Sequence, residues 1–375
     1  MSASDQKIEK YRELFTCFDV DGNGKIDANE LDIGLRNAGM NRCRESIIKM
    51  IDDVDTDNDH ELDFDEFLNL IQSEQLTGLF EGEMTQALEW QQSTVGLQSI
   101  YGQCPTPPET EESVKTGLAR LQIELEGIKK KKGFNQALQK CPHLIDDDFL
   151  LMFLRTEVFH AGRAAQRLVT YWDKRIEIFG ETKAFMRLTL DEALTDDSVA
   201  LSLGYLRPTG RSDSAGRAIL FMDFSQEGKA DYTSFSLVRT VWYAIHVALE
   251  DENAQKDGLV IIVKCVDSLR QWNVKTSKEL AGNMQGALPF RLGCLQFCHP
   301  PSFVNIILKI TRLMLPKKLR SRIRQHKGTH EEVIDSLAIY GIPKSAVPDI
   351  WGGDLNLEGH SEWLEARRSI ENGRY

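Results

Sequence analysis

Residues 19–30 read DVDGNGKIDANE, which places oxygen-bearing side chains at positions 1, 3, 5, 9 and 12 of a twelve-residue loop. Ca²⁺ takes six to eight oxygen ligands, and this spacing supplies them from one short segment. Gly24 stands at position 6, where such a loop needs a sharp turn with positive φ. Apolar residues at helical spacing flank the loop, so we expect it to lie between two helices. The expected ligands are the side chains of Asp19, Asp21, Asn23, Asp27 and Glu30 and the carbonyl of Lys25.

A second loop of the same kind occupies residues 55–66, which read DTDNDHELDFDE. His60 takes the place of the glycine, and because a non-glycine residue at positive φ is strained, we expect this site to be weaker. Paired loops of this kind contact each other through position 8, here Ile26 and Leu62. The two segments resemble an EF-hand pair with two Ca²⁺ sites. The alternative, that each segment is a solvated acidic turn, is disfavoured. The expected ligands of the second loop are Asp55, Asp57, Asp59, the carbonyl of Glu61, Asp63 and Glu66.

The net charge of −12 is unevenly distributed along the 375 residues. Residues 1–80, the acidic head, carry −11, whereas residues 309–327, the basic strip, hold eight Lys and Arg side chains and no acid. The acidic average disfavours nucleic acid as a partner, because phosphate binding depends on Lys and Arg. We expect the head and the strip to attract each other, and bound Ca²⁺ to weaken that attraction.

The N-terminal residues lack the apolar core of a signal peptide, and the longest aliphatic run is far below the roughly 18 residues that span a bilayer. The seven cysteines are scattered and odd in number, which is typical of thiols in a reducing compartment. We therefore expect a cytoplasmic protein.

Three prolines among polar residues at 103–113 (QCPTPPETEES) predict an extended linker. Beyond it, apolar spacing predicts a helix over 114–128 that ends in four lysines, and two short helices over 146–175 joined around Phe159 and His160. The predicted divisions are an EF-hand pair (1–75), a helix and linker (76–112), a helical region (113–180), a core (181–356) and a C-terminal tail (357–375).

Three β-rich runs follow at 216–225, 258–267 and 291–301, and helical patterns separate them, including one over 234–250. Short buried strands that alternate with helices predict an α/β domain with a mostly parallel sheet. The ordered elements resemble the CRAL-TRIO lipid-binding family, which includes tocopherol, retinaldehyde and phosphatidylinositol transfer proteins. The resemblance rests on two strands that end in aspartate, a Pro-x-Arg-x-Gly element and a closing Gly-Gly: Asp223, Asp267, Pro289, Arg291, Gly293, Pro348, Gly352 and Gly353.

A continuous apolar stripe follows the helical pattern after Pro301, and Pro316 ends it. The resemblance implies that this helix is a movable gate over an apolar cavity that holds one lipid. The alternative is that the stripe is ordinary core and the basic strip a solvated helix. The predicted gate residues are Phe303, Ile306, Ile307, Ile310, Leu313 and Met314.

Basic residues directly after the gate suit an anionic membrane surface, because each one adds to reversible binding. By resemblance to the tocopherol branch, Arg291, Lys318 and Arg322 would contact a phosphoinositide headgroup. The phosphatidylinositol branch has an acidic residue just before the Pro-x-Arg-x-Gly arginine, where this chain has Phe290. The resemblance therefore disfavours phosphatidylinositol as the internal cargo.

No nucleotide-binding or hydrolase motif is present, and Cys294, Cys298 and His299 lack a fourth metal ligand nearby. We therefore expect no enzyme. The favoured interpretation is a calcium-responsive lipid-binding or lipid-transfer protein that docks reversibly on anionic membranes. The alternative is a calcium-dependent adaptor, in which the EF-hand groove binds a partner helix and the lipid domain only targets membranes.

Overall fold

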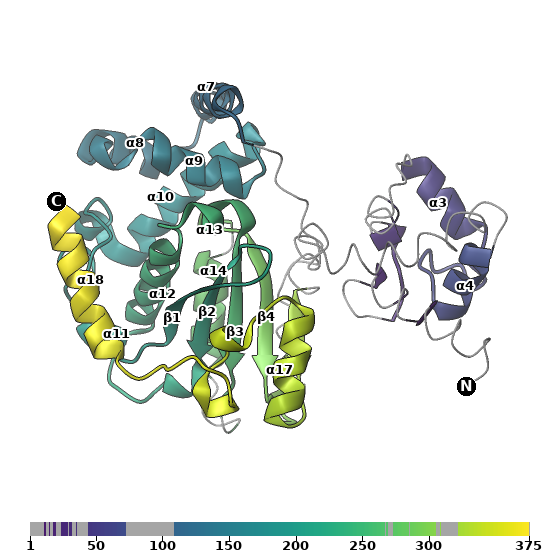
Figure 1. Cartoon of the computed structure of the whole chain (residues 1–375). Coiled ribbons are helices and arrows are strands. Elements are labelled where there is room, and N and C mark those ends of the chain that lie inside the picture. The colour runs from purple at the N-terminus through teal and green to yellow at the C-terminus, as the bar shows by residue number, and fades with distance from the viewer. Residues whose placement is uncertain are drawn as a thin grey trace. The chain divides into compact units, whose positions relative to one another are not determined.

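The computed structural model describes residues 11, 12, 15, 18, 19, 24–28, 30, 31, 35, 44–72, 109–266, 268, 273–284, 286–304, 308 and 322–374. They fall into an N-terminal unit (Met1–Pro105, with Arg312–Arg322) and a second unit (Thr106–Thr311 and Ile323–Tyr375). Figure 1 shows the elements of both units. The helix predicted before the linker and most of the predicted gate lie outside the described residues.

The N-terminal unit contains α3 (Arg44–Asp52) and α4 (Phe64–Gln72). The helices of the second unit are α7 (Glu111–Gly127), α8 (Lys132–Lys140), α9 (Asp147–Thr156), α10 (Ala161–Lys183), α11 (Ser198–Ser202), α12 (Ser234–Ala248), α13 (Glu252–Asp257), α14 (Val274–Met284), α17 (His330–Ile339) and α18 (His360–Arg374). Its strands are β1 (Leu206–Ser212), β2 (Ala218–Asp223), β3 (Leu259–Lys264), β4 (Leu292–Cys298) and β5 (Ile323–His326). Short 3₁₀ turns lie at Pro142–Leu144, Phe224–Gln226, Lys344–Ala346 and Asp349–Trp351.

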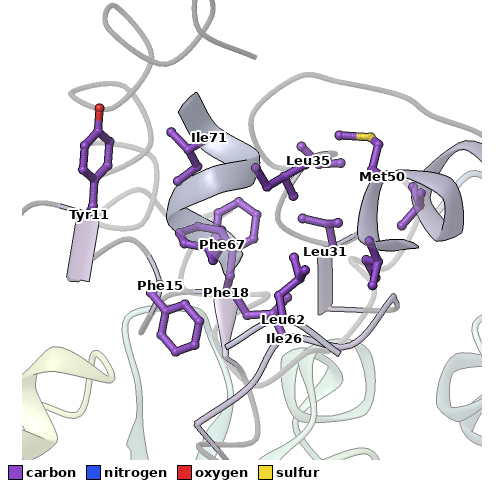
Figure 2. Packing of buried hydrophobic residues seen from close by; sticks show 13 residues of the cluster. Tyr11, Phe15, Phe18, Ile26, Leu31, Leu35, Met50, Leu62, Phe67 and Ile71 are labelled. Carbon is purple, nitrogen blue, oxygen red and sulfur yellow. The ribbon is translucent and has the colours of Figure 1, made fainter. Parts of the chain in front are cut away.

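Aromatic and aliphatic side chains from both loop segments form the core of the N-terminal unit (Figure 2). The rings of Phe15 and Phe67 meet edge to face with centroids 5.4 Å apart, a favourable aromatic geometry. Phe18 contacts the same Phe67 ring from another direction, at 5.4 Å. This shared core holds the residues around the two loops as one unit.

The two loops are joined by a short antiparallel bridge between Ile26 and Leu62. The amide of each residue donates to the carbonyl of the other, at 2.8 and 2.9 Å, and both side chains are fully buried. The predicted contact through position 8 is therefore confirmed. Because the bridge satisfies two backbone donors in the core, it fixes how the loops lie relative to each other.

Helix α7 begins about one turn earlier than the composition of the linker indicates. Thr110 caps α7 by accepting a hydrogen bond from the Ser113 amide, and Ser113 in turn accepts from the Thr110 amide. Residues 111–113, predicted as extended linker, are therefore the first turn of a helix. This reciprocal capping satisfies two backbone amides that would otherwise be unpaired. The prolines all precede Thr110, so they do not prevent the helix from beginning there. At the other end of α7, the Lys131 ammonium contacts the Leu125 carbonyl, so this lysine caps the C-terminus of the helix.

The sheet has the order β1-β2-β3-β4-β5, with β1 antiparallel to β2 and all other neighbours parallel. The predicted runs correspond to the central strands β2, β3 and β4, and the mostly parallel sheet is confirmed. Leu259, Val260 and Ile262 on β3 are fully buried, as expected for a strand covered on both faces. The edge strands β1 and β5 were not predicted, and β5 occupies residues 323–326 of the basic strip.

Strand register divides the side chains between two faces of the sheet. His326 and Gln296 share one face, where His326 contacts Gln296 Oε1 and Ser336 of α17, each at 2.7 Å. Helix α17 therefore covers this face near β5. The opposite face, which we call the crossover face, carries Leu220, Met222, Ile261, Val263, Leu295, Phe297, Ile323 and Gln325.

Residues 357–375, predicted as a tail, mostly form helix α18, which packs on the second unit. The Glu371 carboxylate accepts hydrogen bonds from the Tyr243 hydroxyl at 2.6 Å and the Leu190 amide at 2.9 Å. Arg367 forms an ion pair with Glu250 at 2.7 Å and another with Glu371 at 3.1 Å. The Trp363 ring also lies 6.5 Å from that of Tyr243, but the buried residues Arg367 and Glu371 are polar, which explains why hydrophobic spacing did not reveal this helix.

We expect Glu371→Ala to lower the free energy of unfolding of the second unit by about 1–2 kcal/mol, because it leaves buried donors unpaired. Glu365→Ala, on an exposed position of the same helix, should change it by less than about 0.5 kcal/mol. Urea unfolding followed by tryptophan fluorescence measures both. Equal effects of the two substitutions would show that α18 is not held by these contacts.

Candidate functional site

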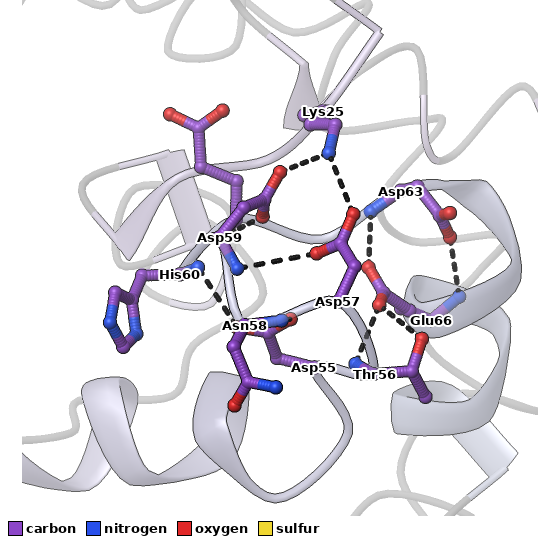
Figure 3. Close-up of polar contacts among 10 residues, drawn as sticks. Lys25, Asp55, Thr56, Asp57, Asn58, Asp59, His60, Asp63 and Glu66 are labelled. Atoms are coloured by element: carbon purple, nitrogen blue, oxygen red, sulfur yellow. Dashed lines mark hydrogen bonds and ion pairs between the residues drawn. The ribbon is translucent and has the colours of Figure 1, made fainter.

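Three carboxylates of the second loop converge within the N-terminal unit (Figure 3). Oxygen atoms of Asp55, Asp57 and Asp59 all lie within 4.8 Å of one another. These residues were predicted as ligands at positions 1, 3 and 5, and the structure brings them together. Three hard anionic oxygens at this spacing match the donor preference of Ca²⁺.

Backbone amides fold the second loop around Asp55. The amides of Asn58 and His60 donate to its two carboxylate oxygens at 2.8 and 2.9 Å. These bonds outweigh the desolvation that opposes ionisation, and they lower the pKa of Asp55. Asn58 and His60 have φ values of 57° and 61°, so the predicted positive φ at His60 is confirmed.

Glu66, at position 12 of the second loop, is buried and held by hydrogen bonds at both oxygens. Its Oε1 accepts from the amide and hydroxyl of Thr56 at 2.7 and 2.8 Å, and its Oε2 accepts from the Asp63 amide at 2.9 Å. Desolvation raises the pKa of Glu66, but the hydrogen bonds from Thr56 and Asp63 prevail and lower it. The side chain is therefore held as an anion at the last position of the loop.

The first loop repeats this hydrogen-bond pattern at equivalent positions. The Gly24 amide donates to Asp19 at 2.9 Å, as His60 does to Asp55. Glu30 accepts from the Asp27 amide at 2.8 Å, and Asp27 accepts from the Glu30 amide at 2.9 Å. Gly24 has a φ of 85°, the conformation that glycine tolerates best. The predicted ligands Asp21 and Asn23 lie outside the described residues.

One contact between the loops was missed from the sequence. The ammonium of Lys25 forms ion pairs with Asp59 and, at 3.3 Å, with Asp57 (Figure 3). The hydrogen bond with Asp59 is the main cause that lowers the pKa of that carboxyl and raises the pKa of Lys25. The sequence predicts only the Lys25 carbonyl as a ligand, because position 7 of the loop contributes its backbone oxygen.

The predicted gate is only partly described. Phe303 is half-buried, whereas Val304 and Leu308 are 2% and 3% exposed. Val304 and Leu308 are spaced by one helical turn, and neither is a member of the predicted stripe. Ile306, Ile307, Ile310, Leu313 and Met314 lie outside the described residues.

The predicted headgroup residues are placed at the beginnings of strands. Arg291 lies directly before β4, is half-buried, and donates from Nη1 to the Lys256 carbonyl at 3.0 Å. Arg322 lies directly before β5 and is also half-buried, and Lys318 is outside the described residues. Cys294 and Cys298 are buried on β4, where the pKa of Cys298 is raised by burial.

No helix among the described residues combines the length and apolar character needed to cross a membrane.

Two family models match the chain: an EF-hand domain pair over residues 8–72 and a CRAL/TRIO domain over residues 204–353. Mouse Clavesin-2 is 27% identical over 228 residues, which cover 58% of this chain and 65% of the relative. The human alpha-tocopherol transfer protein-like protein is 24% identical over 226 residues, which cover 58% and 62%. In Arabidopsis thaliana, the probable calcium-binding protein CML20 is 46% identical over 66 residues, covering 18% of this chain and 39% of the relative. The match thus spans less than two thirds of each of these relatives.

Proposed function

We propose that this chain, which combines an EF-hand domain pair with a CRAL/TRIO domain, is a calcium-responsive lipid-binding and lipid-transfer protein. It binds a hydrophobic ligand in an apolar cavity, docks reversibly on anionic, phosphoinositide-containing membranes from the cytoplasm, and makes or breaks no covalent bond. The observation that carries the calcium part is the pairing of two equivalently hydrogen-bonded loops through Ile26 and Leu62. The lipid part rests on the CRAL/TRIO match, together with the relatives described as transfer proteins.

The residues present fit two Ca²⁺ ions of unequal affinity. Asp19, Asp27 and Glu30 would hold the ion of the first loop, with Asp21, Asn23 and the Lys25 carbonyl completing the set. In the second loop, Asp55, Asp57, Asp59, Asp63, Glu66 and the Glu61 carbonyl would do so. The left-handed conformation of His60 costs about 1 kcal/mol, which supports the lower affinity of the second loop.

The topology supports a cavity over the crossover face near β4 and β5. Successive parallel strands are joined by right-handed crossovers, so the connections after β2 and β3, which contain α12, α13 and α14, cross the same face. Leu220 and Ile261, at the β2 and β3 positions of this face, are fully buried, whereas Leu295 and Gln325, on β4 and β5, are half-buried. Leu295 and Gln325 are thus the least buried of the described side chains on this face, although Phe297 and Ile323 beside them are buried.

The gate segment supports the same location. Val304 and Leu308 are buried, and we propose that they hold the segment on the protein while the residues of the predicted stripe contact the ligand. Phe303, the described member of that stripe, is half-buried. We propose that the remaining stripe residues line the cavity, and that Arg322 and Lys318 contact phosphoinositide headgroups. Arg291 is a weaker candidate, because its guanidinium already donates to a backbone carbonyl.

Mass spectrometry of lipids extracted from the purified full chain tests the cargo proposal. A hydrophobic molecule recovered at about one per chain supports transfer. A chain that carries no lipid, and takes none from mixed vesicles, would contradict it and favour the calcium-dependent adaptor.

Liposome cosedimentation tests membrane docking and its control by calcium. We expect vesicles with phosphoinositide to bind more protein than neutral vesicles, and Ca²⁺ to increase binding by weakening the attraction between the acidic head and the basic strip. Binding that Ca²⁺ leaves unchanged or decreases would argue against this release.

A further inference from the structure

Lys25 belongs to the first loop, but its charged end lies in the second. Its ammonium pairs with Asp59 and with Asp57, and these two carboxylates converge with Asp55 at the predicted second calcium site (Figure 3). The side chain therefore brings a positive charge to the oxygen cluster that a calcium ion would use.

We infer that Lys25 is a built-in competitor for Ca²⁺ at the second loop, which lowers the affinity of that loop and makes the first loop fill first. This inference rests on the proposed binding of calcium by the two loops. It assigns a role to a side chain that the calcium-loop pattern leaves free to vary, since that pattern uses only the carbonyl at position 7.

The fold fixes the position from which the Lys25 side chain extends. The next residue, Ile26, is fully buried and exchanges two backbone hydrogen bonds with Leu62 of the other loop. The Lys25 backbone is thereby held beside the second loop, and the ammonium reaches Asp57 and Asp59 across the short distance set by this bridge. The pairing of the loops therefore keeps the lysine within reach of these two carboxylates.

Competition follows from charge. Ca²⁺ must either displace the ammonium from Asp57 and Asp59 or remain next to a positive charge, and both outcomes weaken binding. The Lys25 side chain is 32% exposed, so it can swing toward water, and solvent screens the repulsion. We therefore expect a moderate effect, a three- to tenfold reduction in the affinity of the second loop, rather than loss of the site.

Lys25 contributes a different group to each of the two loops. Its carbonyl is a predicted ligand of the first loop and its ammonium a competitor in the second, so a single residue takes part in both. A Ca²⁺ ion bound to the Lys25 carbonyl in the first loop does not remove the Lys25 ammonium from the second loop, because the two groups are separate. The first loop should therefore reach saturation at a lower Ca²⁺ concentration than the second.

Isothermal titration of the full chain with CaCl₂ tests the inference with Lys25→Met, which keeps a long side chain and removes the charge. We expect the weaker binding constant to improve three- to tenfold and the tighter one to change by less than twofold. Lys25→Arg, which keeps the charge, should leave the weaker constant within about twofold of wild type. Lys49→Met is the matched control, because Lys49 is an exposed lysine of α3 in the same unit.

Two further backgrounds assign the effect to the second loop. With the first loop disabled by Glu30→Gln, Lys25→Met should still improve the remaining constant three- to tenfold. With the second loop disabled by Glu66→Gln, it should change the remaining constant by less than twofold. The opposite pattern, or equal gains from Lys25→Met and Lys49→Met, would overturn the inference by showing a general charge effect or an effect on the first loop.

The test separates this inference from the proposed function. If wild type binds two ions and Lys25→Met binds both with unchanged affinity, the inference fails while calcium binding stands. If wild type binds only one ion, a second ion in Lys25→Met supports the inference, and its absence overturns it. If wild type binds none, the proposed calcium function fails, and the inference survives only where Lys25→Met gains a site.

Discussion

Glu30→Gln is expected to lower the Ca²⁺ affinity of the first loop by on the order of 100-fold. Glu30 is 8% exposed and accepts a hydrogen bond from the Asp27 amide at 2.8 Å, so its carboxylate is held in place at position 12 of the loop. Glutamine preserves the shape of the side chain and one acceptor oxygen. It removes the negative charge and the second oxygen that a bidentate ligand supplies to Ca²⁺.

Competition with a chromophoric chelator measures this loss, and Asp53→Asn is the control. Asp53 is exposed and lies just outside the second loop, so its substitution removes the same charge without removing a ligand. We expect Asp53→Asn to change either affinity by less than about threefold. A similar loss in both variants would mean that the overall acidity of the head, rather than ligation by Glu30, sets the affinity.

The convergence of Asp55, Asp57 and Asp59 was predictable because it depends on spacing within one segment. Position 8 and the positive φ of His60 follow from the same local pattern, and the structure confirms both. The contact of Lys25 with Asp57 and Asp59 was not predictable, because these residues are more than thirty positions apart and meet only when the loops pair. Local patterns predict ligands within a loop, whereas contacts between the two loops are seen only in the folded pair.

The same distinction applies to the sheet. Strands β2, β3 and β4 are covered on both faces, so their sequences are nearly continuous apolar runs. The edge strands are different: β1 reads LRPTGRS and contains a register shift after Pro208, and β5 reads IRQH. An edge strand pairs on one side only, so it tolerates proline and charge, and its composition resembles a loop.

Gly258→Ala is expected to destabilise the second unit by about 3 kcal/mol or more, through backbone strain and steric overlap. Gly258 has φ 95° and ψ −162°, a region that is essentially restricted to glycine. A Cβ there would also overlap the carbonyl oxygen of Arg291. That carbonyl accepts the Leu259 amide at 2.8 Å, and the Gly258 carbonyl accepts the Ala218 amide at 3.1 Å. Gly258 thus lies where the first residues of β2, β3 and β4 come together, and relieving the overlap would disturb their pairing.

Thermal unfolding of the full chain measures the effect, with Gly282→Ala as the matched control. We expect Gly258→Ala to lower the Tm of the second unit by roughly 6–12 °C. Gly282 lies on α14, and a Cβ there would meet no atom within 4 Å, so alanine should leave the Tm unchanged or raise it slightly. Calcium titration of both variants should match wild type, because Gly258 and Gly282 lie outside the N-terminal unit. Equal Tm values for the two variants would show that the backbone before β3 adapts to a side chain, and that glycine is not required at position 258.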